Sequence, residues 1–324
     1  MPLGTDNDNM ENIIDPIDKK LIKRELTPDK FLRNTNVRDN SIFMVDAHNS
    51  PNTMLEIGRL REYTFRLAGG GTGKKADIDE YDTAEIPFRQ LIVWDHRTEE
   101  IISAYRFICG KDVIPDENGY PHTPTSKLFC FSEEFIRDQW PVCIELGRSF
   151  VQPKFQAGNY ARETLFALDN VWDGLGTLVV DYPDCQYFMG KMTLYNEYSR
   201  EARKLILEFL TSHFHGDEKL IRPWHPVEGD EDIEKNVKKS FDHQESTFKE
   251  EFKILNTKIR QLNTSIPPLI KTYVSLSPTI EYFGTAPNNE FGPVEEMCIL
   301  IKMSDIYESK MNRHIRSYHP RNKQ

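Results

Sequence analysis

The sequence predicts an α/β (α+β) protein in which helices flank a central sheet, and three observations support this prediction. Apolar residues recur at helical spacing in two segments, with the first ending at Leu67. Two β-rich runs stand on either side of a short polar turn, a pattern typical of a hairpin. Two further β-rich runs flank the second helical segment. The expected order is helix, hairpin, strand, helix and strand, over 53–67, 90–108, 143–151, 159–175 and 187–194.

The first helix is expected to begin at Thr53, because Thr53 and Glu56 form a capping-box pattern. Glycines at 69–71 end it. The glycine- and lysine-rich loop that follows is not a phosphate-binding loop, since that motif requires glycine at Ala68, Ser or Thr at Lys75 and a preceding strand. We therefore predict a mobile loop near the mouth of an active site.

The C-terminal half alternates amphipathic and charged segments. Residues 199–213 predict an amphipathic helix, and 232–262 can form a long charged helix with a broken apolar stripe. Two prolines, at 267 and 268, end that helix before a last strand at 297–303. The predicted division is an N-terminal extension at 1–50, a core at 51–215, a charged helical insertion at 216–264, a segment completing the core at 265–304 and a basic tail at 305–324.

Composition narrows the functional classes. The 324 residues are 38% hydrophobic and 28% charged, as is ordinary for a globular protein. No stretch approaches the ~18 consecutive apolar residues of a membrane-spanning helix, and the polar, acidic start does not resemble a signal peptide, so a cytoplasmic location is expected. A net charge of -10 argues against nucleic-acid binding. The five cysteines lack C-x-x-C spacing, which suits reduced thiols.

Two local clusters run against the acidic total charge. Lys19, Lys20, Lys23 and Arg24 stand close together, and basic residues recur over 313–323. Each cluster is either ordinary solvated surface or a contact with anionic lipid at the inner face of the cell membrane.

Histidine spacing offers weaker signals. His225 and Asp230 have an H-x-x-x-x-D spacing that lipid O-acyltransferases use, but nothing else of such a domain surrounds them. His213 and His215 lack a third metal ligand, so no metal site is predicted.

Charged residues in apolar surroundings are the better candidates for a functional site. Glu145 and Arg148 carry opposite charges within the otherwise apolar strand 143–151, where an unpaired buried charge is costly. They either form a structural ion pair with each other or serve a chemical function. Further candidates on the first helix, in the acidic loop and in the hairpin are Arg61, Phe65, Asp79, Asp82 and Arg106.

Several short strings, in a fixed order, carry a resemblance to a known family. The strongest is ELGRSFVQP at 145–153, close to the pattern E-L-[SG]-R-S-x-V-x-P. The others are LREYTF at 60–65, DEYD at 79–82, AYRF at 104–107, WDGL at 172–175, FMGKMTL at 188–194 and PPLIKTY at 267–273. By these strings the sequence resembles the ornithine-lipid and glycine-lipid N-acyltransferases, often labelled hemolysin-like, of the GNAT acyltransferase superfamily.

The resemblance implies a GNAT-like mixed, mostly antiparallel central sheet. It also implies transfer of a long-chain fatty acyl group, with or without a 3-hydroxyl, from acyl carrier protein to the α-amine of glycine or ornithine. The product would be an N-acyl amino acid that a separate O-acyltransferase completes. The GNAT pyrophosphate loop, [QR]-x-x-G-x-[GA], is not cleanly present at 156–161, which favours acyl carrier protein over acyl-coenzyme A. No cofactor is expected.

The resemblance also implies roles for the candidate residues. Glu145 is the expected base, acting through a water molecule, and Arg148 orients Glu145 or binds the substrate carboxylate. Backbone N–H groups near Phe150 and Val151 polarise the thioester carbonyl, and Gly158 also contacts the donor. The expected amino-acid side of the cleft comprises Arg61, Phe65, Asp79, Asp82 and Arg106. The expected basic patch for acyl carrier protein comprises Arg200, Arg203 and Lys204.

Two alternatives stay open on the sequence. One is an acyl-homoserine-lactone-synthase-like enzyme that uses the same donor with S-adenosylmethionine. The other is a non-catalytic module that binds lipid or a partner through the charged helix and basic tail, with Glu145 and Arg148 as a structural pair.

Overall fold

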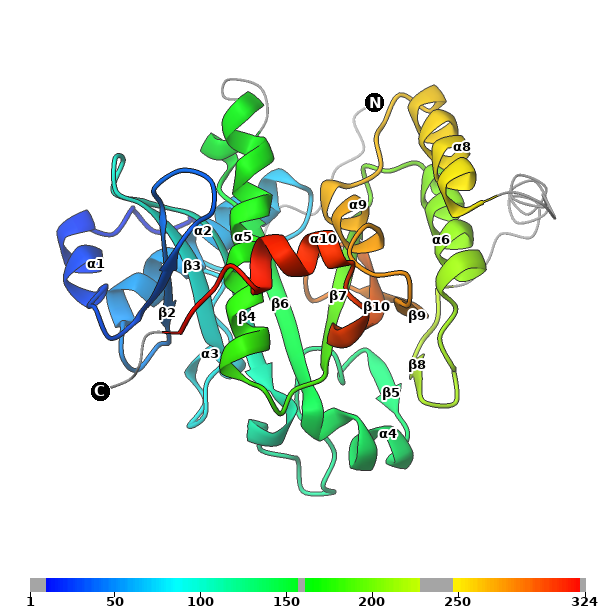
Figure 1. Cartoon of the computed structure of the whole chain (residues 1–324), viewed down its shortest axis with the longest axis horizontal. Coiled ribbons are helices and arrows are strands. Elements are labelled where there is room, and N and C mark those ends of the chain that lie inside the picture. The colour runs from blue at the N-terminus through cyan, green and yellow to red at the C-terminus, as the bar shows by residue number, and fades with distance from the viewer. Residues whose placement is uncertain (1–9, 157–160, 228–246, 321–324) are drawn as a thin grey trace.

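A computed structural model gives the structure of the protein and describes residues 10–156, 161–227 and 247–320. Within these residues, eight strands form one sheet in the order β1-β2-β3-β4-β6-β7-β10-β9 (Figure 1). Their bounds are β1 (Phe31–Asn34), β2 (Ser41–Val45), β3 (Arg89–Asp95), β4 (Glu100–Cys109), β6 (Cys143–Val151), β7 (Tyr187–Tyr195), β9 (Glu281–Asn288) and β10 (Val294–Lys302). A small second sheet pairs β5 (Phe129–Phe131) with β8 (Ile221–Pro223).

The pairings of the main sheet are antiparallel except for β6 with β7, which are parallel. The fold is therefore the mixed, mostly antiparallel and GNAT-like architecture that the sequence predicts. The helices that surround the sheets are α1 (Lys19–Glu25), α2 (Pro51–Leu67), α3 (Glu80–Thr83), α4 (Glu133–Asp138), α5 (Ala161–Asp181), α6 (Arg200–Phe214), α8 (Phe248–Gln261), α9 (Pro268–Val274) and α10 (Glu308–Lys310).

Both faces of the sheet are covered, and β3 shows how the sequence achieves this. Leu91 and Val93 belong to the core cluster on the α5 face, whereas Ile92 and Trp94 belong to the cluster on the α2 face. Successive side chains of a strand point to opposite faces, so a strand buried on both sides reads as a continuous apolar run. Figure 1 shows α5 crossing one face of the sheet.

The feature that positions the site is a splay between β6 and β7. Their parallel pairing spans Cys143 to Leu146 and stops there, although β6 continues to Val151 and β7 to Tyr195. A β-bulge lies at this point, because Tyr105 of β4 faces two residues of β6, and Arg148 there has a φ of 49°. A bulge bends its strand away from its neighbour. The strands therefore separate and leave a gap at their C-terminal ends.

Most predicted elements are confirmed, but the start of the first helix is wrong. The helix α2 begins at Pro51 after Ser50, and Thr53 lies inside it. Thr53 N–H and Oγ1–H both donate to Oε2 of Glu25, each at 2.7 Å, while Asn52 donates to the other carboxylate oxygen. A carboxylate from α1 thus satisfies the first-turn donors that a capping box would satisfy.

Other differences are spread along the chain. Strands β1, β2, β5, β8 and β9 were not predicted, and the last strand, β10, begins three residues earlier than expected. The described part of the predicted charged helix is α8, whose capping box is Thr247 with Glu250; residues 228–246 lie outside the described residues. No helix in the described part of the chain is long and apolar enough to cross a membrane.

Candidate active site

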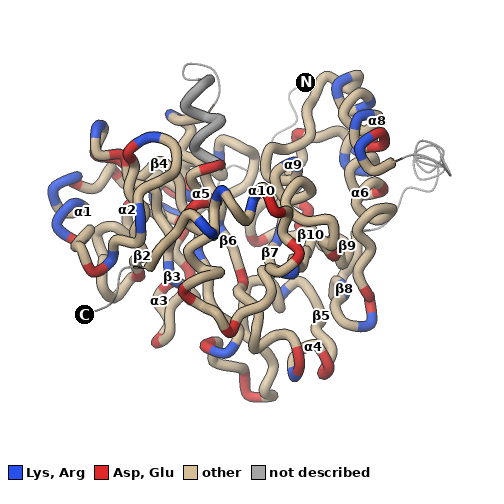
Figure 2. Tube along the Cα trace, viewed as in Figure 1, with Lys and Arg blue, Asp and Glu red and all other residues tan. Residues whose placement is uncertain are grey.

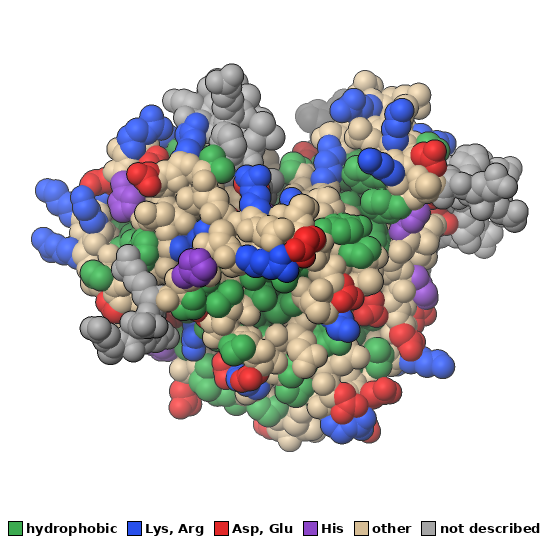
Figure 3. All heavy atoms as spheres, viewed as in Figure 1, with side chains coloured by type: hydrophobic (Ala, Val, Ile, Leu, Met, Phe, Trp, Pro, Cys, Tyr) green, Lys and Arg blue, Asp and Glu red, His purple; other side chains and the backbone are tan. Residues whose placement is uncertain are grey.

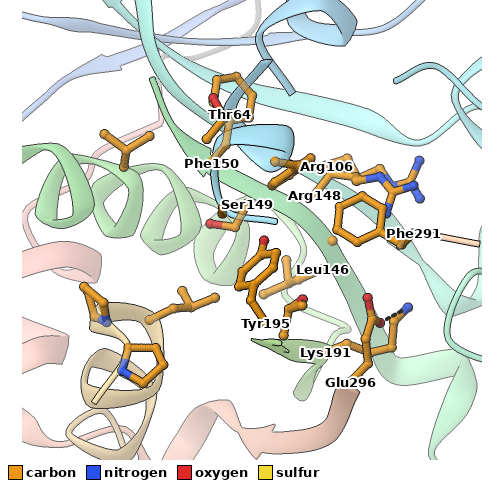
Figure 4. A pocket seen from close by; sticks show the side chains of 18 of the residues that line it. Thr64, Arg106, Leu146, Arg148, Ser149, Phe150, Lys191, Tyr195, Phe291 and Glu296 are labelled. Carbon is orange, nitrogen blue, oxygen red and sulfur yellow. Dashed lines mark ion pairs between the residues drawn. The ribbon is translucent and has the colours of Figure 1, made fainter. Parts of the chain in front are cut away.

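A cavity of about 580 Å³ opens in the splay between β6 and β7 (Figure 4). Its walls come from the end of α2, from β4, β6, β7 and β10, and from the segment 267–269 that leads into α9. The apolar residues among its lining are Phe65, Leu67, Ala68, Phe88, Pro124, Leu146, Phe150, Val151, Pro267, Pro268, Leu269 and Phe291. The rest of the lining is largely polar or charged and includes Arg106, Glu145, Arg148, Lys191 and Glu296. A cavity that combines apolar walls with convergent polar groups is typical of a small-molecule site.

The structure brings most of the predicted site residues to this cavity. Those that line it are Phe65, Arg106, Glu145, Arg148, Phe150 and Val151. Arg61, Asp79 and Asp82 do not line it and lie behind its wall. Gly158 lies outside the described residues.

Glu145 is buried in the cavity wall, with 2% of its surface exposed. Its Oε1 accepts hydrogen bonds from the N–H of Thr125 at 3.1 Å and from the Thr125 hydroxyl at 2.7 Å. Its Oε2 has no hydrogen-bond partner among the described residues. One carboxylate oxygen is therefore fixed by Thr125, and the other is free to accept from a ligand or water.

Arg148 does not pair with Glu145, so the predicted structural ion pair between these two residues is wrong. Its Nε lies 2.8 Å from Oδ2 of Asp77, and its Nη2 lies 3.8 Å from Asp79. The guanidinium also stacks over the ring of Phe291 at 4.4 Å from the centroid. Two aspartates after α2, rather than a neighbour on the same strand, neutralise this buried end of β6.

Behind the wall, the three remaining charged candidates form a buried network. Asp82 Oδ2 accepts from Arg61 at 2.9 Å and from Arg106 at 3.2 Å, and Asp79 accepts from Arg106 at 2.8 Å. Arg61 also donates to Gln90, at 2.6 Å. Every guanidinium in this network already has a carboxylate partner, so the network holds α2, α3 and β4 together.

Mutual neutralisation sets the pKa values in this network. Burial raises the pKa of Asp79, but Arg106 and Arg148 outweigh burial and hold that pKa well below its usual range. Burial lowers the pKa of Arg106, yet Asp82 and Asp79 outweigh it and raise that pKa. At the fully buried Asp77, burial prevails over Arg148 and Arg61, and its pKa is raised.

Comparison with known proteins decides the family. The Acetyltransferase (GNAT) domain family matches residues 60–165, which run from the second half of α2 into the start of α5. A glycine N(alpha)-acyltransferase of Bacteroides thetaiotaomicron is 51% identical over 312 residues, 95% of this chain and 91% of the relative. One of Phocaeicola vulgatus is 50% identical over 309 residues, 95% of this chain and 94% of the relative. The chain belongs to this acyltransferase family. It is an N-acyltransferase with a GNAT domain.

Membership of the N-acyltransferase family overturns one alternative from the sequence. The chain is an enzyme, so the alternative of a non-catalytic binding module is wrong. All of β6 lies within the matched residues 60–165, so the bulge at Arg148 belongs to the matched GNAT domain.

Sequence reasoning missed four polar residues in or beside the cavity of this N-acyltransferase. Asp77 neutralises Arg148, Thr125 holds Glu145, and Lys191 and Glu296 face each other in the cavity. Lys191 and Glu296 did carry a signal, since each is a charge in a β-rich run. Thr125 carried none, because only the folded chain brings residue 125 next to residue 145.

Tyr195 was also missed. It lines the cavity from β7, and its hydroxyl points into the space between the splayed strands (Figure 4). Burial and then the nearby Glu296 carboxylate raise its pKa, against a smaller opposite effect of Arg148. Like an ordinary tyrosine, Tyr195 is protonated at neutral pH and can donate a proton or a hydrogen bond.

The loop after α2 lies where the sequence predicts. Leu67 and Ala68 line the cavity, so the loop begins at its edge. Glu62 fastens this loop by accepting from Thr72 N–H at 3.0 Å and from Gly73 N–H at 2.8 Å. Its predicted mobility stays a prediction.

The histidine spacings noted in the sequence either have structural explanations or involve residues outside the described part of the chain. His213 lies 2.8 Å from Glu251 of α8 and packs on Phe248. Among the described residues, no group of three or more His, Cys, Asp or Glu is placed to hold a metal ion. His225 is described, but Asp230, its predicted partner, is not.

The two basic clusters are partly neutralised. In α1, Lys19 pairs with Glu100 at 3.0 Å and Lys23 pairs with Glu99. Near the C-terminus, Arg313 pairs with Asp169 and Arg316 with Glu308. Figure 2 marks further Lys and Arg positions along α8, and Figure 3 shows basic side chains on the surface of that region. Contact with anionic lipid at any of these clusters stays a prediction.

Proposed function

We propose that this N-acyltransferase transfers a long-chain fatty acyl group from an acyl carrier protein thioester to the α-amine of glycine. The observation that carries this proposal is the 50–51% identity, over 95% of the chain, to two proteins named glycine N(alpha)-acyltransferase. Ornithine is the runner-up amine. The synthase-like alternative finds no support in these relatives.

The cavity suits an acyl thioester. Its apolar lining can bury a fatty acyl chain, and burying each methylene is worth about 0.8 kcal/mol. The N–H of Gln152 donates to Ile102 on β4 at 2.8 Å. Because successive N–H groups of a strand point to opposite edges, the N–H of Val151 points away from β4, toward the splay. Of the two N–H groups expected to polarise the thioester carbonyl, this geometry favours Val151 over Phe150.

Glu145 is the proposed base. The ammonium of the amino acid must lose a proton before its nitrogen can attack, and Oε2 of Glu145 is a buried acceptor that no described residue occupies. The proton passes to Glu145 directly or through one water molecule. The new N–C bond then forms as the C–S bond breaks, the attacking nitrogen releases its second proton to solvent, and the leaving thiolate takes up a proton.

Tyr195 is placed to supply the proton that the leaving thiolate takes up. Its hydroxyl points into the cavity from β7, opposite the β6 edge where the thioester carbonyl would lie (Figure 4). A tyrosine phenol already carries its proton at neutral pH, and the raised pKa of Tyr195 keeps it protonated there. Glu145 on one splayed strand and Tyr195 on the other thus form an acceptor and donor pair.

The start of α6 is the proposed docking surface for the carrier protein. Glu197 and Tyr198 line the cavity, and Arg200 begins the helix two residues later. Lys204 lies one turn further on, and Arg203 pairs with Glu295 at 3.1 Å. Carrier proteins are acidic, so basic residues beside the opening would attract one. We further propose a peripheral location at the inner face of the cell membrane, where a separate O-acyltransferase would complete the lipid.

Purified enzyme tests the proposal. Palmitoyl and 3-hydroxypalmitoyl thioesters of acyl carrier protein and of coenzyme A are each offered with glycine, serine or ornithine, and products are identified by mass spectrometry. We expect N-acylglycine from the carrier thioester in preference to all other combinations. Acylation of ornithine alone, or equal use of coenzyme A thioesters, would contradict the respective part of the proposal.

A further inference from the structure

A second charged pair stands in the cavity, apart from the Arg148 and Asp77 pair. Lys191 of β7 is opposite Cys298 of β10, and Glu296 of β10 is opposite Thr193 of β7. Lys191 and Glu296 are therefore diagonal neighbours on one face of the sheet, and both line the cavity. Figure 4 shows the two side chains side by side.

The pair is buried but loosely joined. The side chain of Lys191 is 14% exposed and that of Glu296 is 4% exposed, yet Nζ and Oε2 are 3.4 Å apart. Oε1 of Glu296 accepts from Asn288 at 3.2 Å, whereas Oε2 receives no hydrogen bond from any described residue. A buried ion pair offsets its desolvation cost only when its remaining donors and acceptors are satisfied. The remaining donors of Lys191 and the Oε2 acceptor of Glu296 therefore need a further partner in the cavity.

The ammonium of Lys191 also has hydrogen-bond donors that its contacts do not fully use. Its second contact is with Oγ1 of Thr125, again at 3.4 Å. An ammonium has three donors. By contrast, the two guanidinium groups that line the cavity have close carboxylates, with Arg106 held by Asp79 at 2.8 Å and Arg148 by Asp77 at 2.8 Å. Of these three cations, Lys191 is the best placed to bind an incoming anion.

The pair is connected to the proposed base. Oγ1 of Thr125 donates to Glu145 at 2.7 Å and lies 3.4 Å from Nζ of Lys191. A group bound at Lys191 is therefore close to Glu145. The chemistry at this end of the cavity is one ammonium flanked by two carboxylates, and Oε2 of each carboxylate accepts no hydrogen bond from a described residue, although Oε2 of Glu296 lies 3.4 Å from the ammonium.

We infer that Lys191 and Glu296 form the subsite for the amino-acid zwitterion, an inference that rests on the proposed function. Lys191 binds the substrate carboxylate, and Oε2 of Glu296 accepts from the substrate ammonium. An ion pair facing a zwitterion keeps this part of the cavity neutral, and the zwitterion satisfies the donor of Lys191 and the acceptor of Glu296 that the surrounding side chains do not satisfy. The bound amine then lies near Glu145, which removes its proton.

This assignment differs from the one that the sequence suggests. There, the amino-acid side of the cleft comprises Arg61, Phe65, Asp79, Asp82 and Arg106. Phe65 lines the cavity but carries no charge, Arg61, Asp79 and Asp82 do not line it, and Arg106 is already paired. The zwitterion subsite instead uses β7 and β10, on the other side of the splay from β4.

The test compares glycine with glycinamide, which has the same amine but no carboxylate, at a fixed concentration of acyl donor. Lys191→Met should lower the ratio of kcat/KM for glycine to kcat/KM for glycinamide by roughly tenfold to a hundredfold, as expected for a lost charge-assisted hydrogen bond. Glu296→Gln should raise the KM for glycine about tenfold. Neither variant should change the KM for the donor.

Matched controls separate this role from a structural one. Glu295→Gln removes the neighbouring carboxylate of β10, which pairs with Arg203 outside the cavity, and should leave the KM for glycine unchanged. If a single variant unfolds, the double variant Lys191→Met/Glu296→Gln keeps the cavity neutral and should show the same loss of discrimination. Thermal unfolding of each variant confirms that it is folded.

The outcomes are distinguishable. Wild-type transfer to glycine, with folded variants whose glycine KM and glycine-to-glycinamide ratio stay within about twofold of wild type, would overturn this inference alone. Absence of transfer to glycine by the wild type would overturn the proposed function and this inference together. A loss of discrimination confined to the Lys191 and Glu296 variants would support both.

Discussion

Nε of Arg148 lies 2.8 Å from Oδ2 of Asp77, and this ion pair ties the bulge of β6 to the segment that follows α2. Arg148 has a φ of 49°, a value that non-glycine residues seldom adopt. The bulge is also where β6 leaves β7. The Arg148–Asp77 ion pair therefore lies at the point where the cavity between β6 and β7 opens.

Replacing Glu145 by Gln should abolish transfer while preserving the fold. The Gln side-chain oxygen can still accept from Thr125, but the amide cannot take a proton. We expect kcat to fall by about 10²- to 10⁴-fold, the usual contribution of a general base. Steady-state kinetics and thermal unfolding measure the two effects. A variant with near-normal kcat would remove Glu145 from the mechanism.

The buried network should be structural. Asp82→Asn leaves Arg61 and Arg106 with one carboxylate fewer between them, and breaking a buried pair costs about 3–5 kcal/mol of unfolding free energy. Urea denaturation measures this loss. Asp184→Asn, which removes the surface partner of Lys111, is the control and should leave the stability unchanged. Equal stabilities of the two variants would refute the structural role.

Acid should destabilise the protein through Asp79. The folded-state pKa of Asp79 is held below its usual value of about 3.9, so at lower pH the unfolded chain binds the proton first. The contribution of Asp79 to stability is thus complete above about pH 4 and is lost as pH falls further. Unfolding free energy measured from pH 6 to pH 2.5 should show a shallower acid loss in Asp79→Asn. Parallel curves for the two proteins would contradict this.

Charge reversal at the start of α6 should weaken binding of the carrier. Arg200→Glu with Lys204→Glu should raise the KM for the carrier thioester several-fold and leave the KM for glycine unchanged. The same thioester on coenzyme A provides the comparison, because it presents no protein surface. The wild-type KM for the carrier should also rise with salt, since exposed charges are screened. An unchanged KM for the carrier would place its docking surface elsewhere.

Local patterns predicted the parts of the fold that depend on local physics. The hairpin β3–β4, the strands β6 and β7, and the helices α2 and α6 follow from periodicity and turn residues. The capping pattern at Thr53 failed because Glu25, from a distant helix, serves the same donors. Strand β9 was missed because its apolar residues adjoin Gly284 and Pro287, which break a strand pattern.

The site was predictable only where chemistry shows in a single segment. Glu145 and Arg148 were identified because charges in an apolar strand are costly, and both line the cavity. Their partners were not predictable, since Thr125 and Asp77 are 20 and 71 positions away from the residues that they serve. The three-residue spacing of Glu145 and Arg148 suggested that they pair with each other. The bulge in β6 separates them, and each has a different partner, Thr125 for Glu145 and Asp77 for Arg148.

The most direct test of the central claim is mass spectrometry of lipids from a host that expresses this chain beside its Glu145→Gln variant. The account predicts an N-acylglycine that appears with the wild type and is absent with the equally abundant, folded variant. No amide lipid from either protein, with both soluble and glycine supplied, would contradict it.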